Sequence, residues 1–275
     1  MKVHHLSCAT LCPVGARFLS GQGGLLATTK LVAHCLLIES GDELVLVDTG
    51  FGTGDVANPG RLGQPFRAAV RPRPQLADTA LHQIEAMGLD PSDVRHIVVT
   101  HLDLDHAGGL GDFPNAAVHV FAPELAAALS PPWTERQRYV AGQWAHGPHW
   151  AEHAVAGERW FGFDSVRLLD QLDVEIALVP LVGHSIGHAG VAVNAGAHWM
   201  LHCGDAYFHH LEMANPHSCP VGLRAFQNIV GHDAKARRAN QERLRELVRR
   251  RGDEVRLFCA HSTVELAREQ ARASS

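Results

Sequence analysis

The chain has 275 residues, 46% of them apolar, and its 24 lysines and arginines against 29 acids give a net charge of −5 with histidine neutral. This length fits a single domain over residues 1–275, and the mildly acidic balance lacks the basic surface of a nucleic-acid-binding protein. No apolar run approaches the roughly 20 residues of a membrane helix, and the N-terminus has no apolar signal core. We therefore expect no nucleic-acid partner, no membrane partner and a cytoplasmic location.

Short apolar runs bounded by turn residues predict strands in the first half of the chain. Between the second and third strands, apolar spacing predicts a helix at Thr79–Met87, which Asp78 can cap and Gly88 can end. The four predicted strands are Leu31–Ile38, Leu44–Val47, His96–Val99 and Ala117–Phe121.

A second set of elements follows, with helices predicted at Ala234–Arg251 and Thr263–Ala273. Two segments, Phe51–Gln75 and Ser130–Asp164, are predicted to be long functional loops. Two similar halves, each a small sheet with covering helices, predict a four-layer αββα sandwich in the α/β (α+β) class. The strands predicted in the second half are Val174–Val182, Gly190–Val193, His198–Cys203 and Val255–Cys259.

Histidine is in excess, with 20 residues in the chain, and metal binding is the first explanation. The densest signal follows a predicted strand, where His101, Asp103, Asp105 and His106 fall within six residues. Residues i and i+2 of an extended segment point to one side, so His101 and Asp103 can hold one ion. If the chain then turns, Asp105 and His106 can face a second ion. Imidazole and carboxylate ligands suit zinc, iron or manganese.

Four further polar residues each come directly after a predicted buried strand, namely Asp48, His184, Asp205 and His261. A single residue in this position is more often a turn or cap residue. Strand-terminal residues at one end of layered sheets can converge in space, however. Together, the repeated placements predict a metal site.

At this point the sequence resembles the metallo-β-lactamase superfamily, over residues 48 to 261. The resemblance is carried by an Asp-Thr-Gly turn, by a motif close to His-x-His-x-Asp-His, and by the separate His, Asp and His that follow. The Asp-His-Ala-Gly-Gly and Gly-His-x-x-Gly-His contexts are most similar to the lactonase and hydrolase branches. The resemblance implies the αββα fold of this family and a binuclear metal site.

Positions matching the family motif imply a role for each candidate residue. One metal position would be held by His101, Asp103 and His184, and the other by Asp105, His106 and His261. Asp205 would bridge the two ions, and Asp48 would orient a ligand without binding metal. Apart from the family motif, His188 is a further candidate for orienting a ligand, with a structural role in a turn as the alternative.

One position departs from the family pattern. Residue 103 is aspartate where the family usually has histidine, which adds negative charge and a harder oxygen ligand. The resemblance implies two divalent metal ions. Zinc is the expected metal, with iron or manganese better suited here than in the usual pattern.

The resemblance implies a metal-dependent hydrolase that cleaves a small-molecule lactone or other ester through a hydroxide bridging the two ions. Asp105 and Tyr207 are candidates for proton handling, although a buried structural role is the alternative for Tyr207. A thioesterase similar to glyoxalase II, an iron-dependent oxygenase similar to the persulfide dioxygenases and a non-catalytic metal-binding protein remain open. The complete second ligand set argues against the mononuclear oxygenase. The sequence makes no prediction about oligomeric state.

Overall fold

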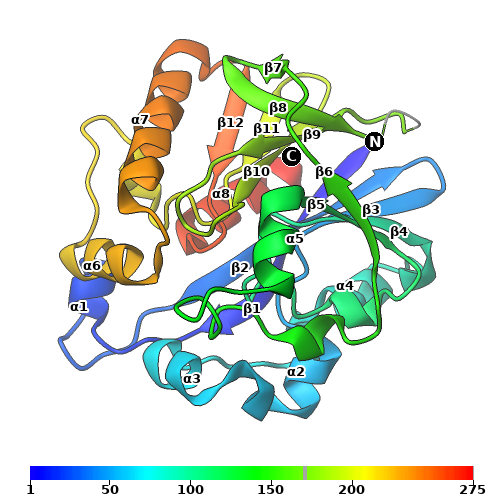
Figure 1. Cartoon of the computed structure of the whole chain (residues 1–275). Helices are drawn as coiled ribbons and strands as arrows, with labels where there is room; N and C mark the ends of the chain where they lie inside the picture. Colours follow the sequence, from blue (N-terminus) through cyan, green and yellow to red (C-terminus); the bar gives the residue numbers. More distant parts are fainter. Residues whose placement is uncertain (170–171, 275) are drawn as a thin grey trace.

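The computed structural model describes residues 1–169 and 172–274 and contains two six-stranded sheets packed face to face (Figure 1). In the first sheet the strand order is β1-β2-β3-β4-β5-β6. The pairs β1–β2 and β2–β3 are antiparallel, and the pairs from β3 to β6 are parallel. These strands are β1 Lys2–Leu11, β2 Leu31–Ser40, β3 Glu43–Val47, β4 Val94–Val98, β5 Ala117–Phe121 and β6 His149–His153.

The second sheet has the order β12-β11-β10-β9-β8-β7. Its β11–β12 pair is parallel and its other pairs are antiparallel. These strands are β7 Glu158–Trp160, β8 Phe163–Leu168, β9 Ile176–Pro180, β10 Ala189–Asn194, β11 Trp199–His202 and β12 Val255–Phe258.

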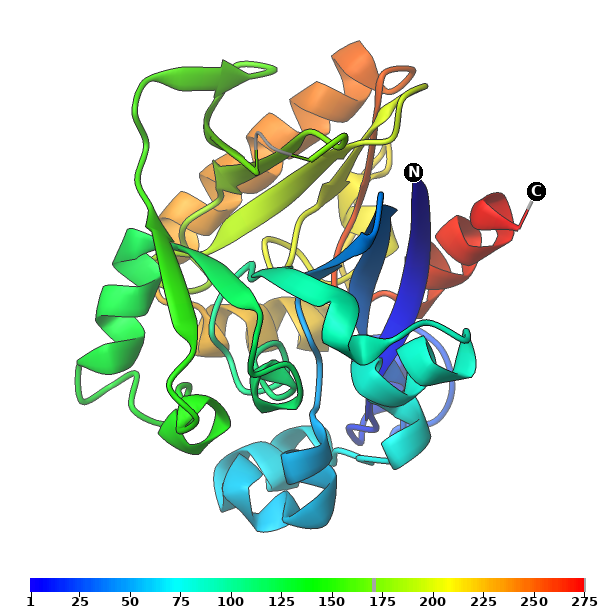
Figure 2. The same ribbon diagram turned by 90° about the vertical axis from the view of Figure 1, so that its right-hand side faces the viewer.

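Three apolar clusters separate four layers. One packs α4 and α5 on the outer face of the first sheet through Ile84 and Leu125, and a second fills the space between the sheets. The third packs α7 on the second sheet through Leu244 and Leu247. The helix α8 lies beside β1, where red and blue ribbons run together in Figure 2. The predicted αββα sandwich is confirmed.

The α-helices of the described residues differ widely in length. The longest, α7, is 18 residues long, and its N-cap Asp233 accepts hydrogen bonds from two backbone amides of the first turn. None of the described helices is both long and apolar enough to span a membrane. The helices are α1 Ala16–Leu19, α2 Thr53–Ala57, α3 Gln64–Val70, α4 Ala80–Ala86, α5 Ala122–Leu129, α6 Val221–Val230, α7 Ala234–Arg251 and α8 Thr263–Ala273.

The predicted loop Phe51–Gln75 is wrong, because this segment contains α2 and α3. Its many prolines and glycines favour a loop on sequence grounds. Pro65 instead occupies the first turn of α3, where a missing amide hydrogen costs nothing. Asp55 accepts a hydrogen bond from the Gly52 amide and closes the first turn of α2. The segment therefore covers one end of the sandwich as helix.

The predicted loop Ser130–Asp164 is also wrong in its second half, which contains β6 and β7. Both are the outermost strands of their sheets. Apart from Trp160, their residues are exposed or half-buried, so the sequence lacks the apolar run that marks a buried strand. At the helix predicted for Thr79–Met87, Thr79 rather than Asp78 caps α4, because its hydroxyl accepts a hydrogen bond from the His82 amide.

Candidate metal centre

Every ligand candidate lies on a loop that directly follows a strand. The loop after β4 carries four of them, and the loops after β9, β11 and β12 carry one each. Backbone hydrogen bonds tie two of these loops to strands of the opposite sheet. The Ala189 amide of β10 donates to the Thr100 carbonyl, and the His34 amide of β2 donates to the Ala260 carbonyl, both at 2.9 Å. Gly204 adopts a φ of +51°, and a Cβ there would come within 2.6 Å of His188 Nε2. The glycine thus permits the close approach of the loops.

The structure brings six of the seven predicted ligands into two groups of three. In each group, the candidate ligand atoms lie within 4.8 Å of one another, and all six residues are buried. The first group is His101, His184 and Asp205, and the second is Asp105, His106 and His261.

Asp205, a member of the first group, also faces histidines of the second group. Its Oδ2 is 3.3 Å from His184 Nε2 and 3.0 Å from His261 Nε2. Its Oδ1 is 3.4 Å from His106 Nε2. One carboxylate therefore contacts a histidine nitrogen of each group, the position expected of a bridging ligand.

A hydrogen-bond network centred on Asp48 fixes the orientation of two histidines. Its Oδ2 accepts from His106 Nδ1 at 2.8 Å and from the Thr100 hydroxyl at 2.8 Å. Because that hydroxyl donates to Asp48, its oxygen accepts from His101 Nδ1, at 2.9 Å. Both rings consequently turn Nε2 toward the centre.

Two further histidines are oriented by the backbone. His261 Nδ1 donates to the Val32 carbonyl at 2.7 Å, which directs Nε2 toward Asp205. His188 Nδ1 donates to the Leu181 carbonyl at 3.0 Å, and its Nε2 accepts from the Asp205 amide at 2.9 Å. Both His188 nitrogens are thus engaged, and the residue positions Asp205.

Buried atoms without hydrogen-bond partners test whether the site fits a metal. Among the described residues, His101 Nε2, His106 Nε2 and Asp205 Oδ1 are buried and have no hydrogen-bond partner. Buried polar atoms rarely remain unsatisfied. Three such atoms that converge on one place, in an imidazole and carboxylate donor set, fit divalent metal ions.

The charges within the centre are strongly coupled. Burial alone would raise the pKa of Asp205, but His261, His106 and His184 hold it well below its ordinary value. Burial would lower the pKa of His106, but Asp205 and Asp48 raise it well above its ordinary value. Metal binding to His106 therefore competes with a proton.

Asp103 belongs to neither group of three. Its Oδ2 lies 3.0 Å from His184 Nε2 and 3.5 Å from His101 Nε2, on the side of the first group. The same carboxylate accepts hydrogen bonds from the Arg138 guanidinium. The first metal position therefore contains an ion pair that the family pattern does not imply.

Tyr207, a predicted candidate for proton handling, points away from the two groups of ligand candidates. Its side chain is fully buried in the cluster beneath α7, and its hydroxyl donates to Glu265 Oε1 at 3.0 Å. Burial and the neighbouring Glu265 raise the pKa of Tyr207 well above its usual range. The residue is held by the scaffold and not by any of the ligand candidates.

Sequence analysis missed two charged residues that support the centre. One is Arg138, from the segment that was predicted to be a loop. The other is Glu124, which is buried on α5. Its Oε1 accepts from the Leu102 amide, and its Oε2 from the Ser185 hydroxyl and the Gly187 amide. An acid within the apolar run of α5 was the available signal for a buried carboxylate.

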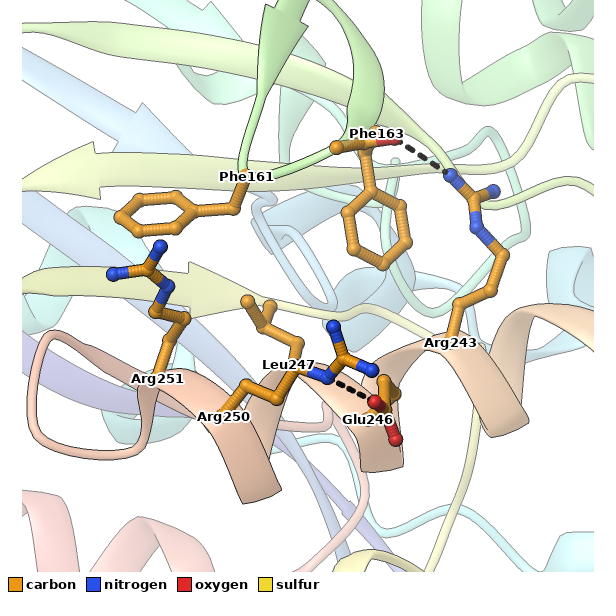
Figure 3. Close-up of a pocket in the computed structure, with 8 residues that line it drawn as sticks. Phe161, Phe163, Arg243, Glu246, Leu247, Arg250 and Arg251 are labelled. Carbon is orange, nitrogen blue, oxygen red and sulfur yellow. Dashed lines mark hydrogen bonds and ion pairs between the residues drawn. The ribbon is translucent and has the colours of Figure 1, made fainter.

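A separate hollow of about 450 Å³ lies between α7 and the turn that joins β7 to β8 (Figure 3). Phe161 and Phe163 form one side, and Arg243 stacks over the Phe163 ring at 4.1 Å. None of the ligand candidates lines this hollow.

Comparison with known proteins extends over most of the chain. The sequence model of the Metallo-beta-lactamase superfamily matches residues 28–247. The chain belongs to this superfamily. A Mycobacterium tuberculosis protein named "Probable metallo-hydrolase" is 45% identical over 274 residues, which is 98% of this chain and 84% of that protein.

Two further similar proteins are named as enzymes that hydrolyse N-acyl homoserine lactones. The Bacillus thuringiensis kurstaki enzyme is 34% identical over 101 residues, which is 36% of this chain and 40% of that enzyme. A solved N-acyl homoserine lactone hydrolase, with the product N-hexanoyl-L-homoserine at its catalytic metal centre, superimposes with a TM-score of 0.73 at 20% identity. This match covers 97% of the chain and 95% of that structure, which shows the shared fold.

Proposed function

We propose that this protein is a metal-dependent hydrolase with two divalent metal ions, which cleaves a small-molecule lactone or other ester. The single observation that carries the proposal is the position of Asp205, whose carboxylate contacts His184 of one group and His261 of the other. Zinc is the expected metal, because imidazole and carboxylate ligands suit it. The lactonases among the relatives support the substrate class.

The chain's own residues prepare the site for such chemistry. Asp48 and the Val32 carbonyl orient His106 and His261, so their Nε2 atoms face the centre. Bound divalent ions in such a site lower the pKa of water and polarise a carbonyl oxygen. Asp105 lies in the second group of ligands and is also the candidate for proton transfer at the reacting bond.

The apolar surroundings of the centre exclude water on one side. The Phe208 ring lies 4.8 Å from the His261 ring and 5.8 Å from the His184 ring, and its side chain is buried. An apolar wall beside the ligands strengthens electrostatic interactions within the site.

Metal analysis and a substrate panel test the proposal. We expect about two metal ions per chain in protein purified without added metal, and hydrolysis of lactones or esters that Asp205→Ala abolishes. The panel also contains a thioester, a phosphoester and a β-lactam. Cleavage of the thioester alone would support the glyoxalase II-like alternative. One ion per chain in fully active protein would revive the mononuclear iron alternative.

A further inference from the structure

Arg138 lies against the first metal position. Its Nη1 donates to both carboxylate oxygens of Asp103, at 2.8 Å to Oδ1 and 2.6 Å to Oδ2. The same Nη1 is 3.0 Å from His184 Nε2. A guanidinium has no lone pair to offer, so His184 must accept this hydrogen bond. Arg138 therefore occupies, through hydrogen bonds, atoms of Asp103 and His184 that the proposed first metal ion would need as ligands.

The other end of the guanidinium is anchored. Arg138 Nε donates to Glu135 Oε2 at 2.8 Å, and Nη2 donates to the Val230 carbonyl. Glu135 also contacts His232 Nδ1 at 3.0 Å. The Arg138 side chain is only 8% exposed. This is a buried, multiply bonded cation and not a solvated surface ion pair, so it costs free energy to move.

The two metal positions consequently differ in charge. Burial would raise the pKa of Asp103, but Arg138 and then His101 hold it well below its usual range. In the second group, no lysine or arginine of the described residues pairs with Asp105, and Asp48 adds a second carboxylate behind His106. The second position is therefore anionic, while the first contains a resident positive charge.

The charge of Asp103, which stands where the family usually has histidine, is offset by the charge of Arg138. Aspartate in place of a neutral histidine adds one negative charge, and Arg138 adds one positive charge beside it. The guanidinium stays charged at every accessible pH, and it repels a divalent cation strongly in a site of low dielectric. An ion at the first position must either displace Nη1 from His184 or share Asp103 with it.

We propose that Arg138 is an internal competitor that makes the first metal position, formed by His101, Asp103, His184 and the shared Asp205, the weaker of the two. The inference rests on the proposed two-metal centre and adds to it an order of filling. The second position fills first and holds its ion, while the first exchanges its ion more readily.

Metal titration of the chelator-treated protein with Zn²⁺, against a chromophoric competitor, tests this inference. Wild type should bind two ions with unequal affinity. Arg138→Gln removes the charge and should tighten the weaker class by about tenfold or more, with the tighter class unchanged. Arg138→Lys keeps the charge and should behave like wild type. Arg136→Gln, an exposed residue of the same segment, is the matched control for the lost charge.

The outcomes separate this inference from the function it rests on. In one outcome, wild type binds two ions with unequal affinity while Arg138→Gln leaves the weaker affinity unchanged or lowers it further. That result would overturn the competitor role alone, since removing a purely structural arginine would weaken metal binding. Two equal classes in wild type would overturn it as well. Binding of one ion by wild type would overturn the two-metal centre and the inference together. If Arg138→Gln does not fold, Arg138→Met, which keeps the apolar stem, supplies the same comparison.

Discussion

Asp48 receives a hydrogen bond from His106 Nδ1 at 2.8 Å while its own backbone adopts a φ of +55°. A residue other than glycine seldom adopts this left-handed conformation. Three hydrogen bonds to the Asp48 carboxylate, two from Thr100 and one from His106, hold it there. The strained turn thus points one carboxylate at the back of the centre, where it orients His106 directly and His101 through Thr100.

Replacing Asp48 should therefore weaken the centre without dismantling it. We expect Asp48→Asn to lower metal affinity by roughly 10–100-fold, the usual effect of removing a group that orients a ligand. Asp205→Ala should cost more, because this carboxylate contacts both groups. Chelator competition and hydrolysis rates on both variants give the comparison. A larger loss for Asp48→Asn, with the fold intact by circular dichroism, would reverse the two roles.

The sequence identified the six residues that converge in the structure because each follows a strand whose apolar run is easy to identify. The helices Ala234–Arg251 and Thr263–Ala273 were predicted with the bounds that the structure gives. The partners of Arg138 and Glu124 could not be predicted, because these contacts are made across the fold, although the position of Glu124 in an apolar run indicates a buried acid. Arg138 meets Asp103 only because the segment before β6 folds back over the first metal position. A single sequence carries no signal for such long-range pairing of charges.

Glu124 is not a ligand candidate, but it should contribute to folding stability. Its carboxylate accepts hydrogen bonds from the loops at Leu102 and Ser185–Gly187 and from the Tyr139 hydroxyl. Glu124→Gln replaces one acceptor oxygen with a donor that faces other donors. We expect a loss of about 3 kcal/mol in unfolding free energy, measured by urea denaturation. Glu152→Gln on exposed β6 is the control and should change stability by about 0.5 kcal/mol at most. Equal effects would refute the bridging role.

His119 should make the metal-free protein sensitive to acid. Burial, and then the neighbouring His153 and His96, lower the pKa of His119 to about 3. An unfolded chain protonates histidine near pH 6.5. Between these values the unfolded state binds the extra proton, so stability is present above the window and is lost as pH falls through it.

The size of this effect can be isolated by substitution. One such proton contributes a slope of about 1.4 kcal/mol per pH unit. His119→Gln should reduce the wild-type slope of unfolding free energy by about this amount between pH 6.5 and 4. His217→Gln, at an exposed site, should leave the slope unchanged. Urea unfolding at a series of pH values measures both, and an unaltered slope in His119→Gln would exclude a buried neutral histidine at this position.

Metal removal should lower thermal stability. The buried Nε2 atoms of His101 and His106 have no hydrogen-bond partner among the described residues, and ligands bound only by the folded state stabilise it. We expect a lower melting temperature after chelation, recovered on adding Zn²⁺ back. An identical melting temperature after verified removal would show that metal binding contributes nothing to folding.

The last prediction concerns the charge at position 103. Asp103→His alone places a neutral imidazole beside the Arg138 guanidinium, so the cation loses its carboxylate partner and the first ion should bind more weakly. Combining Asp103→His with Arg138→Gln removes both charges. This pair should regain the first ion and prefer zinc over manganese or iron, because imidazole is the softer ligand. Asp103→Ala should lose the first ion in either background. Competition titrations with Zn²⁺ and Mn²⁺ on wild type and on these four variants measure these preferences. If every variant bound the same metals as tightly as wild type, Asp103 would not be a ligand. His188 could not replace it in its present orientation, because both of its nitrogens already hold the Leu181 carbonyl and the Asp205 amide.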